Sequence, residues 1–116
     1  MRKFFKAFDY AWSGILYGLQ AERNLKFHLA SAGAVSIAGL FTRLSAMEWC
    51  IVLLLIAGMI ALEMMNAAIE RVVDLITLEI HPLAKQAKDL AAGAVLVYAI
   101  ISVVIGFIIF IPKWFN

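Results

Sequence analysis

Four polar residues that can do acid–base or metal chemistry lie within an otherwise apolar part of the chain. Glu63, Asn66, Glu70 and Asp74 follow one another at helical spacing, so all four side chains share one face of a helix. An ionisable residue inside a membrane-crossing helix costs about 2.5 to 3.5 kcal/mol, and such residues usually face a protein interior or an aqueous cavity. The spacing therefore predicts a carboxylate-lined site. Its structural alternative is a stripe of acids paired with Arg71 or with lysines to lock helices together.

Two further polar segments stand beside apolar runs. Glu22 precedes the first run, and the segment 79–89 precedes the last. Taken alone, Glu22 is typical of a solvated charge at headgroup level, and Lys85 and Lys88 are typical of phospholipid headgroup contacts. The two histidines and Cys50 share no metal-ligand spacing, so a zinc site is not expected. No glycine-rich phosphate loop or kinase catalytic loop of the soluble kinds is present.

The composition indicates what kind of protein positions these residues. Of 116 residues, 65% are hydrophobic and 16% are charged, against roughly half and a quarter in soluble domains. The formal charge of +2 is too small for an electrostatic nucleic-acid binder. One cysteine cannot form an intramolecular disulfide. We therefore predict an all-α integral membrane protein with one domain, 1–116.

The apolar pattern divides this domain into four helices. The first, 1–24, carries aromatic and aliphatic residues on one side and basic residues on the other, which is the pattern of an amphipathic helix on the membrane surface. The ranges 25–42, 47–74 and 88–112 are apolar enough to cross a membrane. Short connections are expected at 43–48 and at 77–81, where Pro82 suits the first turn of the following helix.

Lysine and arginine counts predict the orientation. With the N-terminus in the cytoplasm, eight of the ten basic residues lie inside, and only Arg43 and Lys113 lie outside. The C-terminus is then outside the cell. Small residues recur at Ala30, Ala34 and Ala38, where helices can approach closely. Because three spans cover polar groups poorly in a monomer, we expect a homo-oligomer.

A family resemblance takes the interpretation further. The run Glu63–Asp74, followed by His81 and Ala87–Asp89, resembles the signature of the prokaryotic diacylglycerol kinase family, and the likeness extends over nearly the whole chain. Within that family, Ala87–Leu96 and Glu22–His28 resemble the undecaprenol kinase branch of Gram-positive bacteria. The diacylglycerol branch usually has Gly-Ser where this chain has Ala-Ala at 91 and 92.

The resemblance implies a lipid kinase of the bacterial cell membrane that uses ATP and Mg²⁺, a homotrimer with active sites between subunits. Glu63 matches the proposed general base on the lipid hydroxyl. Glu22 and Glu70 match magnesium-binding carboxylates that hold the ATP phosphates. The other matching positions are Asn66 and Asp74 around the transferred phosphoryl group, Lys88 and Asp89 as nucleotide contacts, and Tyr10, Lys3, Glu79 and His81 on the ATP side. Ala67 and Met65 depart from the usual pattern and affect local packing.

The expected substrate is undecaprenol, and diacylglycerol is the alternative within the same chemistry. A small proton-coupled multidrug transporter is the alternative from another class, since it also uses a glutamate within the membrane. Three spans instead of four, and acids gathered near one face, argue against it. A non-catalytic scaffold does not explain Glu63 together with Glu70. If sites form between subunits, Glu22 and Glu63 of one site could come from different chains.

Overall fold

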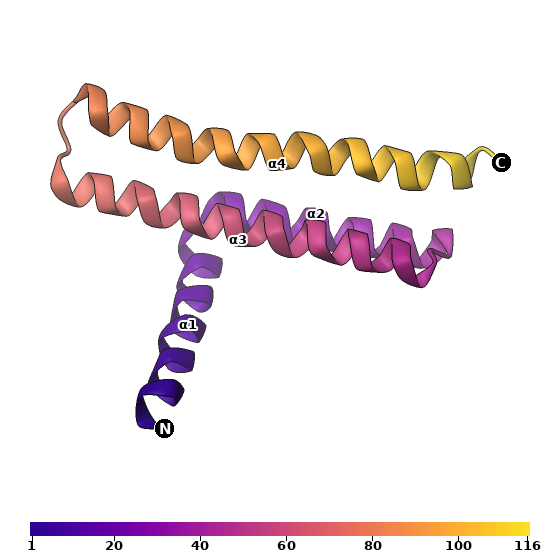
Figure 1. The fold of residues 1–116 in the computed structure, drawn as a ribbon, viewed down its shortest axis with the longest axis horizontal. Coiled ribbons are helices and arrows are strands. Elements are labelled where there is room, and N and C mark those ends of the chain that lie inside the picture. Colours follow the sequence, from indigo (N-terminus) through magenta and orange to yellow (C-terminus); the bar gives the residue numbers. More distant parts are fainter.

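The computed structural model describes all 116 residues, and it consists of four helices joined by short connections (Figure 1). Their bounds are α1 Arg2–Ala21, α2 Arg23–Thr42, α3 Ala46–Ile76 and α4 Pro82–Trp114. The all-helical fold class predicted from the sequence is confirmed.

Three of these helices, α2, α3 and α4, are long and apolar enough to cross a membrane, as predicted. At 1.5 Å per residue, α2 is about 30 Å long, which matches the hydrocarbon core of a bilayer. The longer helices, α3 and α4, are about 46 Å and about 50 Å long by the same rule. They run beside α2 and continue past the corner where α1 meets α2, while α1 leaves the bundle at a steep angle (Figure 1). The last part of α3 and the first part of α4 therefore project beyond the length of α2.

Local signals in the sequence explain where the helices begin and end. Ser45 caps α3 by accepting a hydrogen bond from the Glu48 amide, and the Glu48 side chain accepts one from the Ser45 amide. Because of this capping box, α3 begins at Ala46, and the first connection is shorter than the expected 43–48. Arg43 closes α2 in the left-handed conformation, with φ 61°. At the other connection, Pro82 occupies the first turn of α4 as expected.

The three long helices pack into a bundle with little core of its own. Only 12 of the 116 residues are buried. One apolar cluster, formed by Leu44, Val52, Ile109 and Phe110, lies at the end of the bundle where α2 joins α3. Most other large apolar side chains of the long helices are exposed in the single chain. A surface of this kind is stable against lipid tails or against other apolar helices.

Candidate active site

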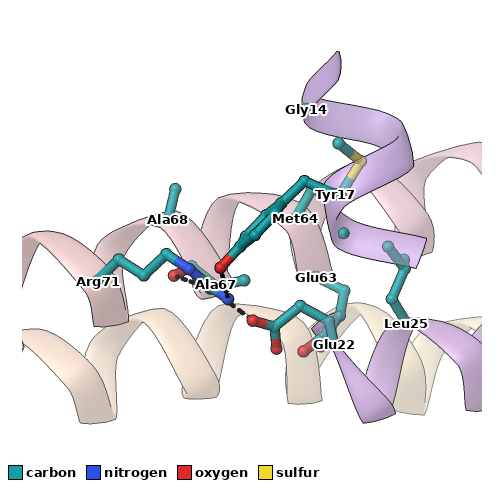
Figure 2. A pocket seen from close by; sticks show the side chains of 10 residues that line it. Gly14, Tyr17, Glu22, Leu25, Glu63, Met64, Ala67, Ala68 and Arg71 are labelled. Carbon is teal, nitrogen blue, oxygen red and sulfur yellow. Dashed lines mark hydrogen bonds and ion pairs between the residues drawn. The ribbon is translucent and has the colours of Figure 1, made fainter. Parts of the chain in front are cut away.

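A cavity of about 220 Å³ lies at the corner where α1, α2 and α3 meet (Figure 2). The corner exists because Glu22 is extended between two helices and because Gly18, which has no Cβ, admits the buried side chain of Leu25. Glu63 and Arg71 line the cavity from α3, and Tyr17 lines it from α1. The remaining lining residues are Gly14, Gly18, Glu22, Leu25, Met64, Ala67 and Ala68.

Glu63 is the most deeply buried carboxylate of the predicted acid face, with 3% of its surface exposed. Its Oε2 lies 3.7 Å from Nε2 of His28, which is on α2. Burial of a carboxylate costs free energy unless a polar partner compensates it. The polar side chain that approaches Glu63 is His28. The separation is longer than a hydrogen bond, as is common for catalytic pairs before substrate is present.

Glu22 and Arg71 form the second polar feature of the cavity (Figure 2). Arg71 Nη1 lies 2.5 Å from Oε1 of Glu22 and also donates to the Ala67 carbonyl at 3.1 Å. Its Nη2 donates to the Tyr17 hydroxyl at 3.3 Å, and the guanidinium lies over the Tyr17 ring. Glu22 is therefore paired with a cation, whereas its position alone was typical of a solvated charge.

Asn66 and Glu70 follow Glu63 on α3, as the helical spacing predicts. Asn66 Nδ2 donates to Oε1 of Glu70 at 3.4 Å. Asn66 is 7% exposed, and its Oδ1 is buried without a hydrogen-bond partner in the single chain. Such an acceptor is costly unless a donor from outside the chain reaches it. Neither Asn66 nor Glu70 is among the residues that line the corner cavity.

Asp74 and Lys88 lie further along, where α3 and α4 project beyond α2. Lys88 Nζ is 2.6 Å from Oδ1 of Asp74, which ties the end of α3 to the start of α4. Asp89 is paired with Lys85 on the same helix at 2.5 Å. The Lys85–Asp89 pair is largely exposed to solvent and the Lys88–Asp74 pair is about half exposed, so each contributes little to stability. In the single chain these residues do not line the Glu63 cavity.

The remaining predicted positions are spread around this end of the molecule. Tyr10 is 73% exposed on α1, and Lys3 and Glu79 are exposed as well. His81 is exposed and caps α4, because its Nδ1 accepts a hydrogen bond from the Leu83 amide at 3.1 Å. The single chain thus gathers Glu22 and Glu63 into one cavity and leaves these four positions outside it.

Three residues of the site were not among those assigned from the sequence: Arg71, Tyr17 and His28. Arg71 is next to Glu70 but lies off the acid face, and its position indicates only a partner that could neutralise acids. By its position Tyr17 lies on the basic side of the surface helix, with Lys3 and Lys6, and nothing in the pattern indicated a role for its hydroxyl. His28 was part of the family motif without an assigned role. The signal that could have indicated a role for His28 is its position, since it is an ionisable residue within the first two turns of a membrane-crossing helix.

The acids of this chain do not form a metal cage by themselves. No three His, Cys, Asp or Glu side chains come close enough together to hold an ion. Magnesium often binds through one or two carboxylates, with water and substrate phosphate completing its shell. The hard oxygen donors of Glu22 and Glu70 suit that kind of binding.

Comparison with known proteins identifies the family of this chain. The model of the family described as prokaryotic diacylglycerol kinase matches residues 9–110. The chain belongs to this family. It is therefore a lipid kinase by family, and ATP is the phosphate donor that a kinase of this kind implies. The transporter and scaffold alternatives receive no support from these similarities.

Three relatives show how similar this chain is to other members of the family. The chain is 55% identical over 113 residues to the undecaprenol kinase of Bacillus subtilis (strain 168), covering 97% of this chain and 92% of that protein. It is 39% identical over 107 residues to the diacylglycerol kinase of Synechocystis sp. (strain ATCC 27184 / PCC 6803 / Kazusa), covering 91% of this chain and 61% of that protein. With the diacylglycerol kinase of Escherichia coli (strain K12), the identity is 27% over 99 residues, covering 85% of this chain and 81% of that protein.

Proposed function

We propose that this kinase transfers the γ-phosphoryl group of ATP to undecaprenol and yields undecaprenyl phosphate. The observation that carries the chemistry is Glu63, a carboxylate buried within a membrane-crossing helix and lining a cavity. The choice of lipid rests on the 55% identity to a relative named undecaprenol kinase. Relatives named diacylglycerol kinase make diacylglycerol the second candidate.

Glu63 acts as the general base in this proposal. The lipid hydroxyl oxygen forms a bond to the γ-phosphorus, the bond from that phosphorus to the bridging oxygen of ADP breaks, and ADP leaves with the electron pair. The hydroxyl proton passes to Glu63. A positioned base of this kind contributes about 10² to 10⁴ in rate. His28, at 3.7 Å from Glu63, is placed to orient the carboxylate.

Glu22 and Glu70 are the residues that would hold Mg²⁺ together with the ATP phosphates. When bound, the ion neutralises charge on the phosphates during transfer. Before nucleotide binds, Asn66 donates to Glu70 and Arg71 pairs with Glu22, so both carboxylates are kept near the site. Lys88 and Asp89, on the projecting part of α4, are proposed as nucleotide contacts, with Asp74 in their hydrogen-bond network. Tyr10, Lys3, Glu79 and His81 complete the proposed ATP side.

The proposed setting is the bacterial cell membrane, with the N-terminus in the cytoplasm and the C-terminus outside. The exposed aromatic side chains Phe4, Phe8 and Trp12 of α1 suit a helix that lies on the membrane surface. The apolar surface left open on α2, α3 and α4 suits assembly into a homotrimer. Glu22 and Glu63 of one chain line the same cavity, which supports a site whose two carboxylates come from one chain.

A phosphorylation assay tests the proposal. Purified protein in lipid micelles receives ATP labelled at the γ-phosphate, with and without Mg²⁺, and undecaprenol and diacylglycerol are offered separately. We expect labelled undecaprenyl phosphate only when Mg²⁺ is present. No labelled lipid from either alcohol would contradict the kinase proposal, and faster labelling of diacylglycerol would reassign the substrate.

A further inference from the structure

Arg71 is the one cation among the residues that line the cavity of Glu63 (Figure 2). Lys88, which the family resemblance assigns to the nucleotide, lies on α4, is paired with Asp74 and does not line this cavity. A lipid hydroxyl that gives its proton to Glu63 must lie within about 3 to 3.5 Å of the phosphorus it attacks. The oxygens of that phosphoryl group must therefore lie in the cavity or at its opening, and Arg71 lines this cavity.

The guanidinium of Arg71 is held in a defined place by three segments of the chain. It donates to the Ala67 carbonyl of α3 and to the Tyr17 hydroxyl of α1, and it pairs with Glu22 between α1 and α2. Its side chain is still 43% exposed. Guanidinium carries five N–H donors in a fork that matches phosphate oxygens, so donors remain for a ligand.

We propose that Arg71 contacts the γ-phosphoryl group that is transferred to the lipid. The inference rests on the kinase function proposed above and adds a substrate contact to it. Glu22 holds the guanidinium at the cavity while no nucleotide is present. When the phosphate arrives, its oxygens take the place of the Glu22 carboxylate, and Arg71 keeps its contacts with Ala67 and Tyr17. Glu22 is then free for its own proposed role beside the phosphates.

The test compares nucleotides that differ only in the γ-phosphoryl group. Affinities for ADP and for the non-hydrolysable β,γ-imido analogue of ATP are measured with Mg²⁺ for the wild type, Arg71→Gln and Arg71→Lys. We expect Arg71→Gln to bind the triphosphate analogue about tenfold more weakly, as loss of a charge-assisted hydrogen bond requires, and ADP within about twofold of wild type. Arg71→Lys keeps the charge and should lose less affinity for the analogue.

Arg23→Gln is the matched control, because Arg23 is exposed at the same end of the bundle and does not line the cavity. It should change neither affinity by more than about twofold. Equal losses for ADP and the analogue in Arg71→Gln, or no loss for either, would overturn the inference. These affinities are measured without lipid, so they do not depend on the phosphorylation assay. If the wild type labelled no lipid alcohol in that assay, the kinase proposal would be contradicted whatever the binding result.

Discussion

The two ends of the helix bundle satisfy their polar groups in opposite ways. At the end where α2 joins α3, which we call the capped end, the polar groups bond to one another within the chain. Trp114 Nε1 donates to the Thr42 hydroxyl at 2.8 Å, and Lys113 lies 2.7 Å from Glu48, which also closes the capping box with Ser45. The buried apolar cluster lies at this same end.

At the other end, which we call the acidic end, α1 meets α2 and α3 around the Glu63 cavity. Glu63 has only the distant His28, and Asn66 Oδ1 has no partner in the chain. The ion pair of Glu22 with Arg71 borders a cavity instead of a packed core. Incomplete satisfaction of buried polar groups costs stability.

The comparison indicates that stability and chemistry are placed at different ends of one bundle. The capped end holds the helices together, and the acidic end leaves donors and acceptors available for substrate. Sites that bind and react are commonly less optimised for stability than the scaffold around them. Substitutions at the acidic end should therefore change catalysis more than folding, and substitutions at the capped end should do the reverse.

The largest effect is expected from Glu63→Gln. The amide fills the same space but cannot accept the hydroxyl proton, so turnover should fall by about 10² to 10⁴. Affinity for ATP should stay near that of wild type, because Glu63 holds no metal in the proposed site. Single-turnover labelling of lipid and equilibrium nucleotide binding measure the two quantities. If Glu63→Gln lost as much affinity for ATP as Glu70→Gln, Glu63 would also take part in nucleotide binding, and the division of roles would be wrong.

His28→Leu should have the next largest effect. Without His28, Glu63 loses the side chain that approaches it, and misplacement of a reacting group by about 1 Å can cost about 100-fold in rate. We expect a tenfold to hundredfold decrease in kcat with KM for ATP nearly unchanged. His28→Gln, which places an amide near the same position, should recover part of the rate.

Ser31→Ala is the control for His28, since Ser31 lies one turn further along α2 and bonds only to the Phe27 carbonyl. Its kcat should match wild type. A His28→Leu variant with wild-type kcat would mean that Glu63 needs no orienting partner. The ring nitrogen signals of His28 in NMR should also shift in Glu63→Gln, while those of His81, the other histidine, should not.

A smaller effect, on affinity, is expected from Glu70→Gln and Glu22→Gln. Each removes one of the carboxylates proposed to hold Mg²⁺, so ATP should bind about tenfold more weakly when Mg²⁺ is present. Without Mg²⁺, the same variants should differ little from wild type. Nucleotide titrations across a range of Mg²⁺ concentrations measure this dependence. Equal weakening with and without the ion would argue that these carboxylates act through packing.

Much of this arrangement could be predicted from the sequence, because it depends on local patterns. Apolar runs indicate the three long helices, although the second carries acids within it, and the spacing of Glu63, Asn66 and Glu70 indicates their common face. Pro82 marks the start of α4. The capping box of Ser45 and Glu48 was not predicted, and it explains why the connection before α3 is shorter than expected.

The contacts between distant segments could not be predicted in the same way. Arg71 and Tyr17 are 54 residues apart in the chain, and they meet only because the chain turns at Glu22. That turn depends on the close approach of Gly18 and Leu25, which no periodicity reveals. The motif indicated that Glu22 belongs to the site, but not that a cation from α3 holds it.

The smallest effect on catalysis is expected at the capped end, from Ser45→Ala. The alanine removes the side-chain oxygen that accepts from the Glu48 amide at 3.2 Å, and loss of such a cap costs about 1 kcal/mol. Thermal unfolding in detergent should therefore occur at a lower temperature, while kcat and KM for ATP stay at wild-type values.

Glu48→Gln separates the cap from the ion pair, because glutamine can still accept from the Ser45 amide but cannot pair with Lys113 as a charge. The unfolding temperature of Glu48→Gln should lie between those of the wild type and Glu48→Ala. If either substitution lowered kcat as much as His28→Leu, the two ends would be coupled along α3, and the division between a stabilising end and a reacting end would not hold.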